Sequence, residues 1–369
     1  MGYPLRILHV VVNMNRGGAE TLIMNLYRNL DRSKVQFDFL TCKEGVFDEE
    51  IVELGGKVHR IPYITDVGHM GYMKALNTFF ATHKEYSIVH SHMDKMSGFV
   101  LRSAKKAGIP IRIAHSHSTS SEGGAAAKMY KWYAGKFILS CATHLLACSN
   151  TAAQWLFTDK ATAARIVKNG IEYDKFTFSP EIKKEVREEL RIHQDTFVVG
   201  HVGRFAHPKN HSFLIDVFAQ LIKLKPNSIL LLAGDGPLRS NIEKKVEELN
   251  LRGSVKFLGI RSDINRLLQA FDVFVFPSIY EGLPVTLIEA QGAGLPCLIS
   301  DAITKEVDLG INLVEHSPLT DTTIWIEKIK HIVTRNLSRN VSNQALSRKG
   351  YDIKHTAELT QDFYFAISR

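Results

Sequence analysis

The amino-acid sequence predicts an α/β protein with two Rossmann-like, doubly wound domains, each built on a parallel β-sheet. Short apolar segments alternate with helical patterns along both halves of the chain, as in βαβ units. The length of 369 residues favours two domains. A turn pair at residues 168–170, before a polar stretch, marks their boundary. We therefore expect domains over residues 1–170 and 171–346, and a helix within 347–369 that could pack back on the first domain.

The strands expected in the first half are short, nearly continuous apolar runs, which are typical of strands that a parallel sheet buries on both faces. They lie at Arg6–Val12, Gln36–Thr41, Ile88–Ser91, Ile111–His115 and Leu145–Ala147. A glycine-rich loop follows the first strand. Gly17 and Gly18 open a helical pattern whose free N–H groups suit an anion such as phosphate. A plain tight turn is the alternative, because the loop lacks the Gly-Lys-Ser/Thr of a P-loop.

Two histidine pairs stand at strand ends in this half. They are His90 with His92, and His115 with His117. A His-x-His pattern suits a metal ion, but the sequence shows no third ligand, so we expect no metal site. A hydrogen bond to a sugar hydroxyl and a purely structural role are both compatible with these histidines.

The net charge of the chain lies entirely in its first half. Residues 1–170 contain 21 Lys and Arg against 13 Asp and Glu, whereas residues 171–369 contain 25 of each. This asymmetry predicts an anionic partner. The segment Lys128–Leu139 combines cations with large apolar side chains at helical spacing, which is typical of a helix on a membrane surface. A core-facing helix with a solvated basic face is the alternative. We find no nucleic-acid-binding motif and expect no nucleic-acid partner.

Other features place the chain in a reducing compartment. Four scattered cysteines show neither a CxxC pair nor a metal-ligand spacing, so we expect free thiols (Cys42, Cys141, Cys148 and Cys297). No apolar run approaches the roughly 20 residues that span a bilayer. We therefore expect a cytoplasmic protein, peripheral on the inner face of the cell membrane.

The second half contains a second set of buried-strand patterns. They lie at Phe197–Val202, Ser228–Ala233, Val255–Phe257, Phe271–Pro277 and Cys297–Ser300. In open α/β sheets, ligands bind at the carboxyl ends of the strands. The loops that follow these strands are therefore the candidate sites.

A loop with two cations follows the strand that ends at Val202. Gly203 begins it, and Arg204 and Lys209 could neutralise a diphosphate, with solvated surface cations as the alternative. A turn at Gly234, Asp235 and Gly236 follows the next strand, where glycines would let a flat base approach. The dinucleotide fingerprint is broken, because Arg stands where its third glycine would be, which disfavours NAD.

Two glutamates lie eight residues apart in the strand–turn–helix unit that begins at Phe271. Glu281 precedes a Gly-Leu-Pro turn, and Glu289 lies within the expected helix, whose first turn suits Pro284. A carboxylate can accept hydrogen bonds from two sugar hydroxyls, and the helix start suits phosphate. A charge that merely complements the helix dipole is the alternative.

Seven of these motifs occur in one order along the chain. They are Gly-Gly-Ala-Glu, His-Ser-His, Lys-Asn-Gly-Ile, Gly-Arg-x4-Lys, Ala-Gly-Asp-Gly-Pro, Phe-Leu-Gly and Glu-Gly-Leu-Pro-x4-Glu. With them the chain resembles, over nearly its whole length, the retaining, GT-B-fold glycosyltransferases of family 4, and most of all the bacterial exopolysaccharide and capsule-synthesis members. The resemblance implies two Rossmann-like domains facing a central cleft, the first binding the acceptor and the second the nucleotide sugar.

The resemblance also implies roles for individual residues. Glu289 would bind the ribose, and Arg204 and Lys209 would clamp the diphosphate beside Gly203. The donor sugar and its phosphate would lie against Glu281, Gly282, Leu283, Pro284 and Val285. The base would lie near Gly234, Asp235, Gly236, Gly259, Ile260 and Arg261. Gly17 and Gly18 would close over the phosphates, and His115 or His117 would touch the transferred sugar.

The implied reaction moves a hexose or N-acetylhexosamine from a nucleotide sugar, most commonly a UDP-sugar, to a lipid-linked saccharide acceptor. The catalytic candidates are His115, His117, Arg204, Lys209 and Glu281. Because the chain has no Asp-x-Asp, no metal cofactor is expected. Beyond Asp301 the chain departs from the family pattern, so we carry no role past that residue. A GT-B-fold UDP-sugar epimerase or hydrolase, and a non-catalytic nucleotide-sugar-binding assembly partner, are the alternatives.

Overall fold

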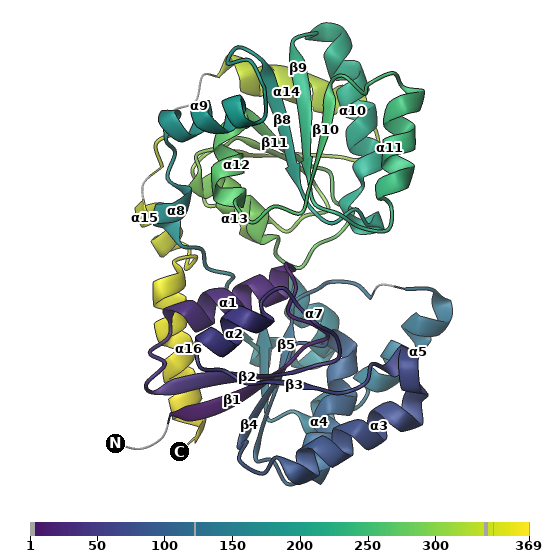
Figure 1. Ribbon diagram of the computed structural model, residues 1–369, viewed down its shortest axis with the longest axis vertical. Coiled ribbons are helices and arrows are strands. Elements are labelled where there is room, and N and C mark those ends of the chain that lie inside the picture. Colours follow the sequence, from purple (N-terminus) through teal and green to yellow (C-terminus); the bar gives the residue numbers. More distant parts are fainter. Residues whose placement is uncertain (1–3, 122, 336–338, 342, 369) are drawn as a thin grey trace. The chain divides into compact units, whose positions relative to one another are not determined.

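The computed structural model of the protein describes residues 4–121, 123–335, 339–341 and 343–368. These residues form two compact units (Figure 1). One unit comprises the chain up to Gly170 together with the chain from Gly350 onward, and the other comprises Ile171–Lys349. Each unit has its own parallel sheet and its own hydrophobic core.

The first unit is built on a seven-stranded parallel sheet of order β3-β2-β1-β4-β5-β6-β7. Its strands are β1 (Leu5–Val10), β2 (Val35–Thr41), β3 (Val58–Arg60), β4 (Ile88–Ser91), β5 (Ile111–Ser116), β6 (His144–Ala147) and β7 (Arg165–Ile166). Its α-helices are α1 (Gly18–Asn29), α2 (Asp48–Glu53), α3 (Ile64–Thr82), α4 (Ser97–Lys106), α5 (Ala125–Gly135), α6 (Ile138–Cys141), α7 (Asn150–Phe157) and α16 (Ile353–Ser368).

The second unit is built on a six-stranded parallel sheet of order β10-β9-β8-β11-β12-β13. Its strands are β8 (Phe197–Val202), β9 (Ser228–Ala233), β10 (Val255–Gly259), β11 (Val273–Phe276), β12 (Cys297–Ser300) and β13 (Val314–Ser317). Its α-helices are α8 (Tyr173–Phe176), α9 (Pro180–Glu189), α10 (His211–Leu224), α11 (Arg239–Glu248), α12 (Ile264–Ala270), α13 (Val285–Gly292), α14 (Thr322–Thr334) and α15 (Asn343–Arg348).

The predicted α/β class with two parallel sheets is confirmed. Residues of β8, β9, β11 and β12 are buried at every position, which explains why these strands lack the alternation of a half-exposed sheet. The sequence analysis missed the short strands β3, β7 and β13. They contain few consecutive apolar residues and are only partly buried, so the apolar-run criterion could not find them.

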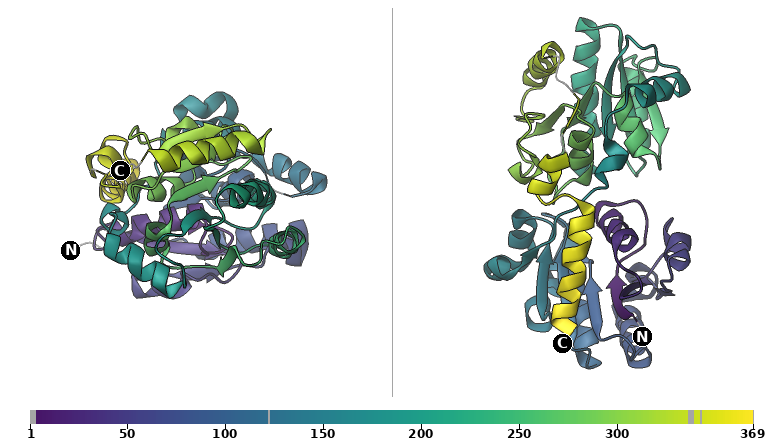
Figure 2. Two further views of the ribbon diagram at one scale, coloured as in Figure 1. Left: turned by 90° about the horizontal axis from the view of Figure 1, so that it is seen from above. Right: turned by 90° about the vertical axis from the view of Figure 1, so that its left-hand side faces the viewer.

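The C-terminal segment contains two helices where the sequence predicted one over Ser347–Ser368. The first of these helices, α15, ends at Arg348. Gly350 then adopts the left-handed backbone conformation that glycine tolerates best (φ +74°). Helix α16 then lies along the first unit (Figure 2). It packs beside α1 and adds Ile353, Ala357 and Tyr364 to that unit's core.

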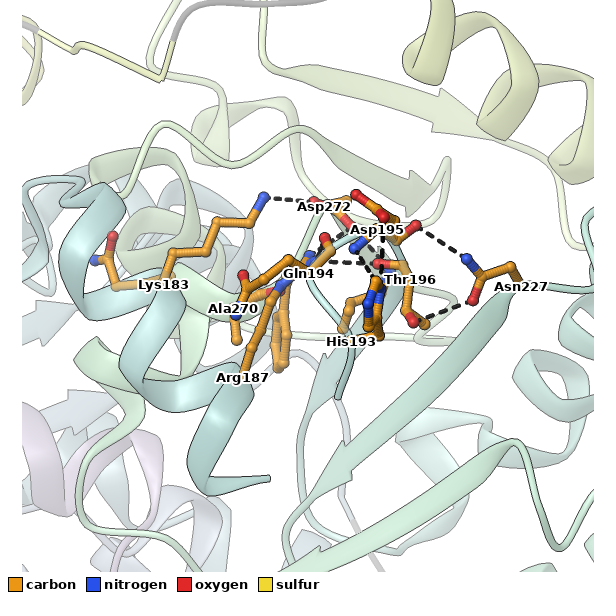
Figure 3. Close-up of polar contacts among 12 residues, drawn as sticks. Lys183, Arg187, His193, Gln194, Asp195, Thr196, Asn227, Ala270 and Asp272 are labelled. Atoms are coloured by element: carbon orange, nitrogen blue, oxygen red, sulfur yellow. Dashed lines mark hydrogen bonds and ion pairs between the residues drawn. The ribbon is translucent and has the colours of Figure 1, made fainter. Parts of the chain in front are cut away.

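A polar network ties α9 to the sheet of the second unit (Figure 3). The buried guanidinium of Arg187 forms an ion pair with Asp272 (2.8 Å) and donates to the carbonyl oxygens of Ala270, Gln194 and Thr196. The Asp272 carboxylate also accepts a hydrogen bond from the backbone N–H of Val198. These groups precede or begin β8 and β11, so the network lies at the amino ends of the strands.

Two further findings concern the described residues. No helix among them combines the length and apolar character needed to cross a membrane. The four cysteines are free, and all but Cys42 are buried.

Candidate functional site

Three loops of the second unit meet at the carboxyl edge of its sheet. They follow β8, β9 and β10, which are neighbours in the sheet. The N–H of Gly203 donates to the carbonyl of Ala233, and the N–H of Gly234 donates to that of Gly259. The N–H of Phe205 donates to the carbonyl of Asp235. Predicted residues from three separate motifs are therefore held together by backbone hydrogen bonds.

The glycine at position 234 is required by this loop packing. Its φ is +136°, and a Cβ there would lie 2.1 Å from the carbonyl oxygen of Gly203. A Cβ at Gly236 would lie 2.5 Å from the carbonyl oxygen of Phe205. We expected these glycines to give a base room to approach, and the structure shows that their missing side chains make room for the neighbouring loop. Asp235 is exposed, and its carboxylate accepts a hydrogen bond from the N–H of Gly236.

Lys209 and Glu281 form an ion pair between the loops that follow β8 and β11. The Lys209 Nζ lies 2.6 Å from Oε1 of Glu281, and their side chains are only 20% and 14% exposed. The ammonium also lies 4.7 Å from the ring centre of Phe276. Arg204 begins the same loop as Lys209 and is exposed. The loop thus carries two cations, Lys209 in an ion pair and the exposed Arg204.

Glu289 lies within α13, as the sequence predicted, and is mostly buried. Desolvation raises the pKa of this carboxyl to about 7. Helix α13 begins at Val285, with Pro284 as the extended residue before it, so the proline stands one position earlier than expected. Gly282, Leu283, Pro284 and Val285 are buried, and they connect Glu281 to the helix.

The loop after β10 presents an apolar side chain to solvent. Ile260 is 67% exposed, beside Gly259 with its left-handed φ of +67°. The guanidinium of Arg261 is held by Asp263 through two hydrogen bonds of 2.8 and 2.5 Å. The exposed Ile260 is therefore available to pack against a flat ligand, whereas Arg261 is already occupied.

In the first unit, Glu20 lies over the predicted anion-binding loop. Gly17 stands immediately before α1, and a Cβ on it would lie 2.2 Å from Oε2 of Glu20. Burial raises the pKa of Glu20 to about 7, a hydrogen bond to its own backbone N–H lowers it, and nearby Asp94 raises it. The carboxylate of Glu20 thus already lies at the helix start. No atom lies within 4 Å of the place where a Cβ on Gly18 would stand.

His115 and His117 belong to a cluster of five histidines in the first unit. The Nδ1 of His115 lies 3.1 Å from Nε2 of His90, and the Nε2 of His117 lies 2.8 Å from Nδ1 of His92. The Nε2 of His92 lies 2.9 Å from Nδ1 of His9. Desolvation lowers the pKa of each ring, to about 3 for His9 and His117, so the cluster is neutral at physiological pH.

Several residues of these sites were not predicted from the sequence. His9 lies inside β1 and Tyr364 lies in α16, and neither stands in a strand-end motif. His201 and His211 are buried below the Lys209 loop, with ring centres 4.7 Å apart, and burial lowers the pKa of His201 to about 4. Only the sheet order, which sets β1 between β2 and β4, could have brought His9 to the predicted histidines.

Comparisons with known proteins bear on both units. Residues 17–170 match the family described as "Glycosyl transferase 4-like domain", and residues 182–340 match "Glycosyl transferases group 1". EpsF of Bacillus subtilis (strain 168), which carries the provisional name of glycosyltransferase, is 39% identical, over 97% of this chain and 96% of EpsF. The Escherichia coli protein named UDP-Gal:alpha-D-GlcNAc-diphosphoundecaprenol alpha-1,3-galactosyltransferase is 26% identical, over 98% of this chain and 96% of that protein.

Solved structures share the fold. Anabaena Alr3699/HepE in complex with UDP-glucose has a TM-score of 0.83 and 21% sequence identity, covering 98% of this chain and 99% of that chain. A sucrose-phosphate synthase from Thermosynechococcus elongatus has a TM-score of 0.80 and 21% identity, covering 98% of each chain. These likenesses show that the fold of the chain is shared with both proteins.

Proposed function

Because this chain belongs to the GT-B-fold glycosyltransferases of family 4, it is a glycosyltransferase, and we propose that it acts in exopolysaccharide or capsule synthesis. It transfers a hexose or N-acetylhexosamine from a UDP-sugar to a lipid-linked saccharide, with retention of configuration. The second unit binds the donor, and the first unit binds the acceptor.

The observation that carries the donor assignment is the ion pair between Lys209 and Glu281 beside the exposed Arg204. Two cations at the carboxyl edge of a parallel sheet suit a diphosphate. Glu289 on the adjacent helix would accept hydrogen bonds from the ribose hydroxyls once ionised. The UDP-glucose bound to HepE and the UDP-galactose in the name of the Escherichia coli relative support a uridine nucleotide.

The proposed reaction follows from the leaving group. The bond between the sugar C1 and the diphosphate oxygen breaks, and the acceptor oxygen forms its bond to C1 on the same face. The acceptor proton passes to the departing phosphate. Arg204 and Lys209 stabilise the negative charge as it forms. Glu281 holds Lys209 in place and contacts the donor sugar.

The acceptor assignment rests on the relatives. The Escherichia coli relative is named for transfer to a GlcNAc linked to diphosphoundecaprenol, which is a lipid-linked acceptor. A capsular polysaccharide biosynthesis glycosyltransferase of Staphylococcus aureus, CapH, is 27% identical over 98% of this chain and 99% of CapH. An enzyme on such acceptors works where the lipid is anchored, at a membrane surface.

The donor is tested by thermal stabilisation with UDP, GDP, ADP and their sugar conjugates. A ligand that binds only the folded state raises the melting temperature by mass action. We expect a shift with UDP and UDP-sugars that Glu289→Ala abolishes. The matched control is Glu248→Ala, which removes an exposed glutamate of α11 paired only with Lys244. A shift with none of the nucleotides, or an equal shift in Glu289→Ala, contradicts the donor site.

Transfer is then tested with the UDP-sugar that binds and a short-chain lipid diphosphate saccharide. Sugar appearing on the acceptor with its anomeric configuration retained supports the proposal. Release of free sugar without transfer, or conversion of the UDP-sugar into its epimer, would instead establish hydrolysis or epimerisation.

We further propose that a surface on α3 and α5 of the first unit docks on an anionic membrane. Exposed apolar side chains gather there, including Met70 (80% exposed), Met129 (68%) and Trp132 (53%). A hydrogen bond of 2.6 Å between His69 and Tyr130 joins the two helices. Beside them lies a hollow of about 460 Å³, whose lining contains three cations (Arg102, Lys105 and Lys106). Apolar anchors surrounded by cations suit the interface of an anionic bilayer.

Membrane docking is tested by co-sedimentation with vesicles of phosphatidylcholine alone or mixed with phosphatidylglycerol. We expect binding to the anionic vesicles that weakens with salt and is lost in Met129→Ser/Trp132→Ser. A control variant, Leu224→Ser, removes an equally exposed apolar side chain of the second unit and should bind normally. Equal binding by both variants contradicts the assignment.

A further inference from the structure

The five clustered histidines lie on one face of the first unit's sheet. In the parallel register His9 stands beside His90. His92 lies two residues beyond His90, and His115 and His117 are likewise two residues apart, so each pair shares a face. Phe37 and Phe39 of β2 pack against His9, and Tyr364 of α16 lies within hydrogen-bonding distance of His90 (2.7 Å). Within this cluster of five histidines, four are buried and His117 is partly exposed.

The histidines form two hydrogen-bonded chains. One runs from His9 through His92 to His117, and the other runs from Tyr364 through His90 to His115. A neutral imidazole has one N–H and one lone pair, so each ring can donate once and accept once. Three ring nitrogens at the chain ends are buried without a partner among the described residues: His9 Nε2, His115 Nε2 and His117 Nδ1. Burial of an unpaired polar atom is costly, so these atoms indicate a ligand.

Three of the five histidines lie close together where β4 and β5 end. His92, His115 and His117 each have one ring nitrogen within 4.8 Å of one from each of the other two. His92 and His117 lie just beyond β4 and β5, where the loops can adjust. In a tetrahedral zinc site with Zn–N bonds of about 2.0 Å, the ligand nitrogens are about 3.3 Å apart. Small ring rotations would therefore close the triad around an ion.

We propose that His92, His115 and His117 form a binding site for a divalent first-row transition metal ion, with Zn²⁺ the best match. Imidazole nitrogens suit zinc, and three protein ligands leave a fourth position for water or another ligand. This site goes beyond the proposed glycosyltransferase activity and does not depend on it.

The remaining histidines fit the second shell of such a site. For His115 to offer Nε2 to the metal, its proton must lie on Nδ1, where His90 Nε2 accepts it. For His92 to offer Nδ1, its proton must lie on Nε2, where His9 Nδ1 accepts it, and the metal must replace the hydrogen bond between His92 Nδ1 and His117 Nε2. Metal-ligating histidines usually donate their other N–H to such a partner, which fixes the tautomer.

The other triad, His9, His90 and His92, is a weaker candidate. Its nitrogens also lie within 4.8 Å of one another. However, it contains only one unpaired nitrogen, and His90 is held between Tyr364 and His115 on its two sides. The strand-end triad contains two histidines with an unpaired ring nitrogen, His115 and His117, and leaves His9 and His90 in a hydrogen-bonding role.

The experiment is a titration of the chelator-treated, full-length protein with Co²⁺ followed by visible absorption, and with Zn²⁺ followed by calorimetry. We expect one equivalent to bind with the absorption of nitrogen-ligated cobalt, which Zn²⁺ displaces. His117→Ala, at the more accessible end of the triad, should lose this binding. His90→Gln, in the second shell, should weaken it by about 10–100-fold. The matched control is His83→Ala, from a histidine pair of the same unit that has no third histidine ligand among the described residues.

The outcomes separate the site from a folding defect. Circular dichroism and the melting temperature without metal show whether each variant is folded, and His117→Asn replaces any variant that is not. Absence of stoichiometric binding to the wild type, or equal binding by wild type, His83→Ala and the folded His117 variant, overturns the site. UDP-induced stabilisation of the same samples reports on the second unit, so failure of the metal site and failure of the donor site are distinguishable.

Discussion

The carboxyl group of Glu289, in the proposed donor site, makes the stability of the protein depend on pH. Burial raises its pKa to about 7, from 4.5 for the free group. The folded protein therefore binds a proton more tightly than the unfolded chain, so this group's contribution to stability falls as pH rises from 4.5 to 7. Above pH 7 the buried charge costs at most about 3 kcal/mol.

We expect Glu289→Gln to raise the melting temperature at pH 8 and to leave it nearly unchanged at pH 5. The same variant should lose UDP binding, because the amide cannot accept from two hydroxyls as the carboxylate does. Melting curves of both proteins between these pH values, with and without UDP, provide the measurement. If the melting temperature of Glu289→Gln at pH 8 were below that of the wild type, the Glu289 charge would be stabilised rather than penalised in the protein without UDP.

A second prediction concerns Arg204 and the rate of sugar transfer. Arg204→Ala should reduce turnover by about 10²- to 10³-fold while leaving the melting temperature unchanged, because the side chain acts on charge that develops at the leaving diphosphate. Arg252→Ala removes an equally exposed arginine of the same unit and is the control. Near-wild-type turnover in Arg204→Ala would remove this residue from the proposed mechanism.

Sequence reasoning at this scale found strand-end residues but not their partners. Lys209 and Glu281 were each predicted from a local motif, yet their ion pair joins residues far apart in the chain. Glu20 stands two residues after Gly18, but the position of its carboxylate over the helix start depends on its side-chain conformation rather than on spacing. Side-chain pairing across strands is set by sheet order, which no single motif encodes.

At the scale of elements, α9 depends on the buried Arg187. Without Arg187 the Asp272 carboxylate keeps Lys183 (2.9 Å) as a partner, but the carbonyl oxygens of Ala270, Gln194 and Thr196 lose their donor. A buried acceptor left without a hydrogen bond costs about 1–3 kcal/mol. We therefore expect Arg187→Ala to destabilise the second unit by a few kcal/mol, about the sum of such losses, measured by denaturant unfolding. Arg266→Ala is the control, because the Arg266 side chain is 34% exposed and pairs with Glu185 and Glu189 of the same helix. Equal, small effects of both variants would show that the packing of α9 does not depend on the Arg187 network.

Strands with continuous apolar runs were predicted well. Short edge strands and breaks between helices were not. The bounds of Phe197–Val202, Ser228–Ala233 and Cys297–Ser300 agree with β8, β9 and β12, because these strands are buried throughout. The predicted helical segment Lys128–Leu139 divides into α5 and α6, and the break after Gly135 carries no proline to mark it. Edge strands and helix breaks are decided by tertiary packing, which is weakly encoded in local sequence.

At the scale of the molecule, the second unit is one continuous segment with its own sheet and core. The main hydrophobic cluster of this unit lies between Phe197 and Ile332. We expect residues 171–349, expressed alone, to fold cooperatively and to bind UDP. Deletion of residues 350–369 should instead unfold the first unit, because it removes Ile353, Ala357 and Tyr364 from the core of that unit. Calorimetric unfolding of the two truncated proteins, beside the full chain, provides the measurement. An unfolding transition like that of the full chain after the deletion would contradict the role of α16.

The return of α16 to the first unit has a consequence for synthesis on the ribosome. The first unit begins to emerge before the second, yet it lacks α16 until the whole second unit has been translated. Throughout that interval the apolar surface that α16 covers, including the ring of Phe37 against Tyr364, stays open to chaperones. The second unit, by contrast, needs no residue beyond Lys349 to complete its fold. The unit that starts first is therefore the one that finishes last.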